Sequence, residues 1–291
     1  MANSNGWGDG AANNSIGWGQ GANNNIGWGD SHAKSWAGLT DIVGLTTDAD
    51  AQAFITAAAI TDATQKSAID TLVKGMKADG IWTKMKAIYP FVGGTATTHK
   101  WNLKDPRDLD AAFRLVFNGG WTHSSTGATP NGTNGYADTL LIPSTSLSIS
   151  SSHLSVYSRT NTPSTAYTGY DIARGNYSLI TQYNGNTFFA NLENAGLYLA
   201  SATVSNGLGF YIASRLNNTS VQGFKNSSKL INAVQSSSLA TSSLLIGSIG
   251  TTNFSSKQYA FASIGDGLTD TEAANLYTRV QAFQTALSRQ V

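Results

Sequence analysis

The sequence lacks cysteine and is poor in charge. Across its 291 residues there is no cysteine, which excludes disulfides, thiolate catalysis and cysteine-ligated zinc. Charged residues make up 12% of the chain, about half the usual ~25%, and the formal net charge is +1. Binding to nucleic acid needs clustered Lys and Arg, so we predict no nucleic-acid partner. Low charge is typical of extracellular or assembled structures.

Long apolar runs are missing as well. No stretch approaches the roughly 20 apolar residues that a membrane helix needs, and residues 1–10 show no signal-peptide pattern. We therefore predict no membrane insertion. A chain without disulfides often gains stability by oligomerising, so we expect a homo-oligomer, although no coiled-coil heptads specify one.

The first part of the chain repeats a short phrase. Gly-Trp-Gly occurs at Trp7, and Ile-Gly-Trp-Gly occurs at Trp18 and Trp28. Such a Gly-rich segment cannot fold alone, yet each Trp can bury on the order of 200 Å² and Trp is enriched among interface anchors. We predict that residues 1–45 form an extended arm that docks on another protein; the alternative is a turn structure packed on its own domain. The predicted anchoring residues are Trp7, Ile16, Trp18, Ile26, Trp28 and Trp36.

A helical pattern follows. Apolar residues recur at helical spacing over residues 48–59 and again in a second helix, for which Thr61 or Asp62 is the expected N-cap and Gly80 the end. Residues 81–88 are expected to be helical or irregular, and Asp105-Pro106 predicts the start of a further helix that ends near Gly119. The sequence therefore predicts a helical connector over residues 46–120.

Alternating apolar and polar residues dominate the rest of the chain. Without a βαβ rhythm, short strands at this spacing predict an antiparallel sandwich or barrel over residues 121–291. Asn184-Gly185 indicates a hairpin, and the phrase from Thr269 to Glu272 is a capping box that predicts a final helix. The predicted strands cover 139–142, 154–158, 170–173, 178–183, 187–192, 209–214, 220–225, 244–249 and 259–263.

This C-terminal part resembles concanavalin A-like (laminin-G-like) jelly-roll domains. The similarity is carried by residues 209–215 with 221–226, by 244–249, and by 260–265 followed by 268–272. It implies a mainly β protein whose jelly-roll sandwich follows the helical connector and the Gly/Asn/Trp-rich arm. The resemblance is specific for the fold and implies little about a ligand.

Nearly the whole chain is also similar to virion proteins of tailed bacteriophages that infect Bacteroidetes-type hosts. The Ile-Gly-Trp-Gly repeats, the phrase from Trp82 to Gly94 and the phrase from Leu103 to Asp108 carry this similarity. It implies a virion structural protein (a fibre, tail or capsid decoration) that contacts other virion proteins and is released by lysis. The alternative is an adhesin that binds host-surface glycan during adsorption.

Enzymatic chemistry is not favoured. Retaining glycosidases need two carboxylates about 5–5.5 Å apart, and the sequence holds two glutamates, Glu193 and Glu272. Glu193 has no acidic neighbour two residues away. Glu272 is explained by the capping box. The four histidines show no metal-ligand spacing. We predict no catalytic residues and no cofactor, and a polysaccharide depolymerase is the least favoured function.

The sequence offers candidate residues for two kinds of ligand, a glycan and a calcium ion. Aromatic faces for a glycan could come from Tyr167, Tyr170, Tyr183, Tyr198 and Tyr211, although most tyrosines on strands pack into or beside the core. A structural calcium ion would take Asp and Asn oxygens, and the candidates are Asn131, Asn134, Asp138 and Asp171. Loops of Asn, Asp and Gly are also ordinary turns, so these residues have a structural explanation as well.

Overall fold

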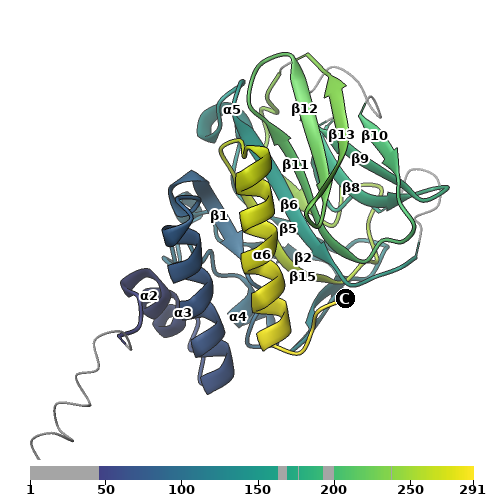
Figure 1. The fold of residues 1–291 in the computed structure, drawn as a ribbon. Helices are drawn as coiled ribbons and strands as arrows, with labels where there is room; N and C mark the ends of the chain where they lie inside the picture. Colours follow the sequence, from purple (N-terminus) through teal and green to yellow (C-terminus); the bar gives the residue numbers. More distant parts are fainter. Residues whose placement is uncertain (1–45, 163–168, 176, 193–199, 237) are drawn as a thin grey trace, which may run out of the picture. The chain divides into compact units, whose positions relative to one another are not determined.

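The computed structural model describes residues 46–162, 169–175, 177–192, 200–236 and 238–291. The chain divides into two compact units, Met1–Thr47 and Asp48–Val291, and every described helix and strand lies in the second (Figure 1). The predicted arm, with all six anchoring residues, therefore lies outside the described residues. No helix in the described part of the chain is long and apolar enough to cross a membrane.

The first sheet, sheet A, is antiparallel and is centred on β6 (Ser152–Ser158) and β15 (Tyr259–Gly265). Among the described residues it has eight strands, in the order β13-β12-β11-β6-β15-β4-β3, and β1 also pairs with β15. The remaining strands are β1 (Met85–Tyr89), β3 (Trp121–Ser124), β4 (Gly127–Pro130), β11 (Gly209–Arg215), β12 (Ser220–Lys225) and β13 (Ser228–Val234).

The second sheet, sheet B, runs in the order β10-β9-β8-β7-β14-β5-β2. Its strands are β2 (Val116–Asn118), β5 (Tyr136–Asp138), β7 (Ile172–Arg174), β8 (Tyr177–Tyr183), β9 (Thr187–Asn191), β10 (Ser201–Thr203) and β14 (Leu245–Ile246). Inward-facing side chains such as Leu154, Leu179 and Tyr211 form a buried core with the other apolar residues of both sheets. Two antiparallel sheets with a shared core confirm the predicted mainly β sandwich.

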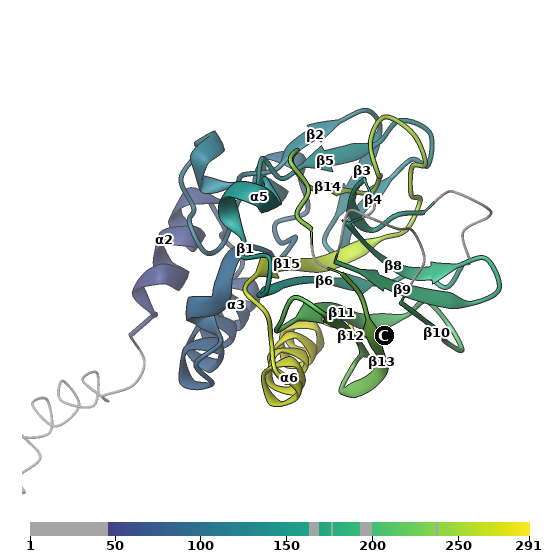
Figure 2. The same cartoon turned by 90° about the horizontal axis from the view of Figure 1, so that it is seen from above.

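Helices cover the other face of sheet A. These are α2 (Ala49–Ala57), α3 (Ala63–Ala78) and α6 (Asp270–Ala286), and Figure 2 shows α6 lying beneath β6 and β11. A second core joins Leu72 and Met76 of α3, Phe210 and Phe261 of the sheet, and Phe283 of α6. The unit Asp48–Val291 therefore has three layers: helices, sheet A and sheet B.

The described segment 48–120 is part of this body. Residues 46–120 were expected to form a separate connector, but residues 48–291 form one compact unit. The residues expected to be helical or irregular include β1, which pairs with β15 from Met85↔Gly265 to Tyr89↔Ala262. The pairing of β1 with β15 and the core shared with sheet A and α6 join this segment to the sandwich.

Two sequence predictions of local structure were wrong. The helix expected from Asp105 is a short 3-10 turn, η2 (Asp110–Ala112), which ends because Phe113 adopts a left-handed conformation with φ 56°. The carboxylate of Asp105 pairs with the Arg107 side chain. The strand expected over 139–142 lies earlier, as β5, because Leu140 has φ 57° and breaks the extended backbone. Short helices α4 (Ala96–His99) and α5 (Pro143–Ser146) were not predicted.

Candidate functional site

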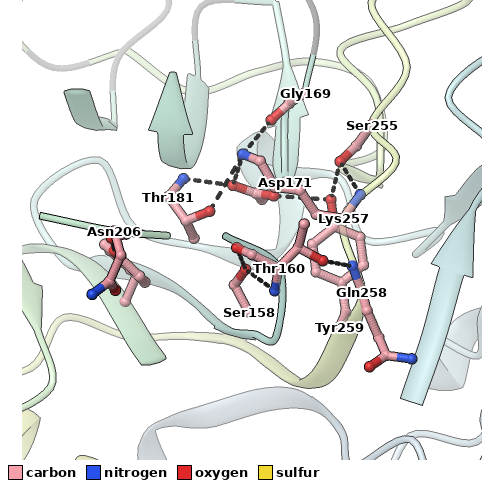
Figure 3. A network of polar contacts seen from close by, with 11 residues as sticks. Ser158, Thr160, Gly169, Asp171, Thr181, Asn206, Ser255, Lys257, Gln258 and Tyr259 are labelled. Carbon is pink, nitrogen blue, oxygen red and sulfur yellow. Dashed lines mark hydrogen bonds and ion pairs between the residues drawn. The ribbon is translucent and has the colours of Figure 1, made fainter. Parts of the chain in front are cut away.

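A buried network of polar side chains lies at one end of the sandwich (Figure 3). Its centre is the ion pair of Lys257 and Asp171, with Nζ 3.1 Å from Oδ2 and side chains that are 3% and 0% exposed. Asp171 lies just before β7, and Lys257 lies just before β15. The network therefore joins segments that enter the two sheets from distant parts of the chain.

Each charge in this pair is fully satisfied by neighbours. Lys257 Nζ also donates to the Gly169 carbonyl at 2.9 Å and to Thr181 Oγ1 at 3.3 Å, which gives the ammonium group three acceptors for its three protons. Asp171 accepts from the Tyr259 hydroxyl at 2.9 Å and from the Thr181 backbone N–H. An isolated buried charge is costly, and these contacts offset that cost.

Burial shapes the protonation of this cluster. It lowers the pKa of Lys257, and the nearby Asp171 carboxylate opposes that shift. Burial and the same carboxylate raise the pKa of Tyr259 well above its usual value, so the hydroxyl stays neutral and donates its proton to Asp171. Ser255 Oγ lies 2.7 Å from the same hydroxyl oxygen. The network therefore holds the segments before β7 and β15 together, because each buried donor has an acceptor.

The same end of the sandwich is secured by a second set of contacts. Asn206 accepts through its backbone carbonyl from the Tyr211 hydroxyl at 2.7 Å and from Lys225 Nζ at 2.9 Å. Thr160 Oγ1 accepts from the Gln258 backbone N–H at 2.8 Å. Loops 160–162, 205–208 and 255–258 are therefore tied to the strands they connect.

His99, at the end of α4, contacts His123 of β3. His99 Nδ1 lies 2.9 Å from His123 Nδ1, and His99 Nε2 accepts from the Gly94 backbone N–H at 3.2 Å. The neutral His99 ring therefore carries its proton on Nδ1 and donates it to His123. Burial, followed by the proximity of His123, lowers the pKa of His99 to about 3.

The side-chain oxygens of the residues predicted to bind calcium are used in hydrogen bonds and an ion pair within the protein. Asn131 Oδ1 accepts from the backbone N–H groups of Thr133, Asn134 and Gly135, which is the hydrogen bonding of a turn. Asp138 Oδ1 accepts from the Leu140 N–H, and Asp171 is bound to Lys257 as described. The described residues contain no group of three or more His, Cys, Asp or Glu that could hold a metal ion.

The tyrosines proposed for glycan binding do not form a common exposed face. Tyr170 and Tyr211 are 1% and 0% exposed, so neither ring can offer a face to a ligand, and both predictions were wrong. Tyr183 is half-buried and packs edge-on against Phe189 with centroids 5.7 Å apart. Tyr167 and Tyr198 lie outside the described residues. Period-2 alternation does not reveal which strand face a second layer covers.

Comparison with solved structures finds low similarity to this chain. No protein-family model matches the chain, and no curated protein matches it. Domain 4 of AbnA, a GH43 extracellular arabinanase from Geobacillus stearothermophilus solved with arabinotriose, is 15% identical over 66% of this chain and 98% of that domain, with a TM-score of 0.44.

Two further solved structures are more distant. Trypanosoma rangeli sialidase with the inhibitor DANA is 12% identical over 57% of this chain and 30% of that chain, with a TM-score of 0.40. The Ca²⁺-bound exoplasmic/lumenal domain of VIP36 is 9% identical over 63% of this chain and 91% of that domain, with a TM-score of 0.31. Similarity this low assigns no function to any residue of the present chain.

Proposed function

We propose that this protein is a structural component of a tailed-bacteriophage particle, a fibre, tail or capsid decoration. Its N-terminal Trp repeats bind other virion proteins, and its β-sandwich body is displayed. The observation that carries the proposal is the repeated phrase in the sequence, because Trp7, Trp18 and Trp28 recur in similar contexts before the described residues begin. Equivalent anchors fit equivalent pockets on a repeated or symmetric partner.

The charged side chains of the sandwich favour a structural function over a catalytic one. Glu272 accepts from the Thr269 backbone N–H at 2.8 Å and binds Lys84 Nζ at 2.6 Å, so this carboxylate serves a helix cap and an ion pair. Asp171 and Lys257 are sealed inside the sandwich. Each of these described groups has a structural role, and we do not propose a depolymerase; Glu193 lies outside the described residues.

The proposal is tested by incorporation into particles. A phage that encodes the protein without residues 1–36 is expected to assemble particles that lack it, as is a phage whose three repeat tryptophans, Trp7, Trp18 and Trp28, are changed to alanine. Trp101→Ala is the matched control, because Trp101 lies in the body, where it is half-buried beside Lys100. Normal amounts of the truncated protein in purified particles would overturn the proposal.

The solution mass of the purified protein tests the expected homo-oligomer. If the full chain and the form lacking residues 1–36 have the same oligomeric mass, the body carries the self-association and the repeats remain free for a virion partner. If truncation yields a monomer, the repeats hold copies of this chain together, and the anchoring role must be replaced by self-assembly.

A further inference from the structure

Partly exposed aromatic side chains and uncharged loops lie together at the β2–β5 edge of the sandwich. We call this the aromatic–amide strip: Phe117, Trp121, loop 131–135, Tyr136 and Phe254. The four aromatic residues are half-buried, and most of the loop is exposed. None of them takes part in the buried network described above.

The Trp121 side chain has a fixed orientation at one end of the strip. Its Nε1 donates to the Asn118 carbonyl at 3.2 Å, and the His123 imidazole stacks on it with an interplanar angle of 26° and centroids 6.1 Å apart. Phe117 meets it edge-on at 5.2 Å. A half-exposed ring held by three neighbours loses little entropy when a ligand packs against it.

Loop 131–135 is interlocked with the turn that precedes Trp121. Asn134 Oδ1 accepts from the Gly120 N–H at 3.0 Å, and the Asn131 N–H donates to the Gly120 carbonyl at 3.0 Å. A Cβ on Gly119, where φ is +67°, would lie 2.0 Å from the Asn134 carbonyl oxygen. This close approach excludes any other residue there and makes the two loops one rigid surface.

The second aromatic pair adjoins the other side of the same loop. Tyr136 follows the loop directly and stacks with Phe254 at an interplanar angle of 30° and a centroid distance of 6.4 Å. The Gly132 N–H donates to the carbonyl of Ser255, the residue after Phe254. Contacts on both sides of loop 131–135 therefore place amide side chains between two aromatic pairs.

We propose that the aromatic–amide strip binds a neutral carbohydrate chain. Aromatic rings pack against the apolar C–H faces of sugars. Asn131 Nδ2 donates to Asn134 Oδ1 at 2.8 Å, so these amides hold the uncharged loop in place between the rings. Residues 118–121, 131–136 and 251–256 contain no Lys, Arg, Asp or Glu, so an anionic sugar would find no opposite charge there. The inference extends the proposed function, in which the body is displayed, but the chemistry does not depend on assembly into a particle.

Titration of the full-length protein with defined sugars tests the strip. The probes are hexasaccharides of β-1,4-glucose, β-1,4-mannose, β-1,4-xylose and α-1,4-glucose, with hexagalacturonate as the anionic comparison. At least one neutral probe is expected to bind and to shift the Trp121 indole N–H signal in NMR spectra. Trp121→Ala and Phe254→Ala should each weaken that binding about tenfold or more, the loss of one packed aromatic contact.

Matched variants separate binding from folding. Trp101→Ala removes a half-buried Trp beside Lys100, away from the strip, and should leave affinity unchanged, whereas Trp121→Phe keeps an aromatic packing partner and should retain partial affinity. Failure of every neutral probe to bind at about 10 mM would overturn the inference, as would unchanged binding by Trp121→Ala and Phe254→Ala or equal binding of hexagalacturonate. Particle incorporation plays no part in this measurement, so either proposal can fail alone.

Discussion

At Lys257 and Asp171, opposite charges are held together without contact with solvent. Lys257→Met should lower the free energy of unfolding by about 3–5 kcal/mol, because it leaves the Asp171 carboxylate buried without its counter-ion. Adding Asp171→Asn to that variant should recover part of the loss, because it removes the unpaired charge. The Thr181 N–H can donate to the amide oxygen, and the Tyr259 hydroxyl can accept from the amide nitrogen. Urea unfolding followed by circular dichroism measures both changes.

A surface pair provides the comparison. Lys229 and Asp270 lie 2.6 Å apart with side chains 34% and 57% exposed, and exposed pairs contribute about 1 kcal/mol or less. Lys229→Met should therefore change stability far less than Lys257→Met. Equal effects of the two substitutions would show that Lys257 is solvated in solution.

The burial of His99 and His153 makes stability depend on pH. Burial lowers the pKa of His99 to about 3 and of His153 to about 4, both from 6.5. The unfolded chain therefore binds more protons than the folded chain between these values. The stability that the folded protein gains by keeping these two histidines neutral is fully present above about pH 6.5. It is lost as the pH falls toward their folded pKa values.

This pH dependence can be measured directly. The free energy of unfolding should decrease between pH 7 and pH 5, with an upper limit near 1.4 kcal/mol per pH unit for each histidine. Nitrogen-15 spectra at pH 6 should show neutral rings, with the proton of His99 on Nδ1 and that of His123 on Nε2. A protonated His99 at pH 6 would contradict the hydrogen bond from Gly94.

At the scale of elements, α6 begins with a complete capping box. The Thr269 side chain accepts from the Glu272 N–H, and Glu272 accepts from the Thr269 N–H. Thr269→Ala should cost about 1 kcal/mol of stability. Thr278→Ala, an exposed change within the same helix, should be neutral or slightly stabilising because alanine favours helix. Thermal unfolding of the two variants decides this, and equal losses would refute the cap's contribution.

Elements were predictable from sequence where local signals agreed with tertiary pairing. The capping box fixed the start of α6, and the alternation of 154–158 and the hairpin at Asn184-Gly185 matched β6 and the β8–β9 pair. β1 was missed because its residues pair with β15, which lies more than 170 positions later in the chain. Short strands such as β2 and β5 gave no usable period, since three residues are too few for alternation to show.

The candidate site was less predictable than the fold. Asp171 was singled out by residue type as a calcium ligand, but its partner Lys257 lies 86 positions away, and no motif links them. Trp121 stood out only as one tryptophan among seven, and its neighbours Phe254 and Asn134 come together through loop contacts. Which tyrosine faces the core depends on how the layers stack, and a single strand does not encode that.

At the scale of the whole molecule, the helical segment and the sandwich share one core. Leu72 and Met76 of α3 are in the same buried cluster as Phe210, Phe261 and Phe283, and Arg279 of α6 binds Asp79 at the end of α3 through Nε at 2.7 Å. We therefore predict that residues 48–120 do not unfold before the sandwich. Hydrogen exchange of the full chain in increasing urea should give peptides from α3 and from β6 the same opening free energy. Earlier loss of protection in α3 would show an independent connector, and Phe283→Ala, which opens a cavity between the layers, should lower both values together by about 3–5 kcal/mol.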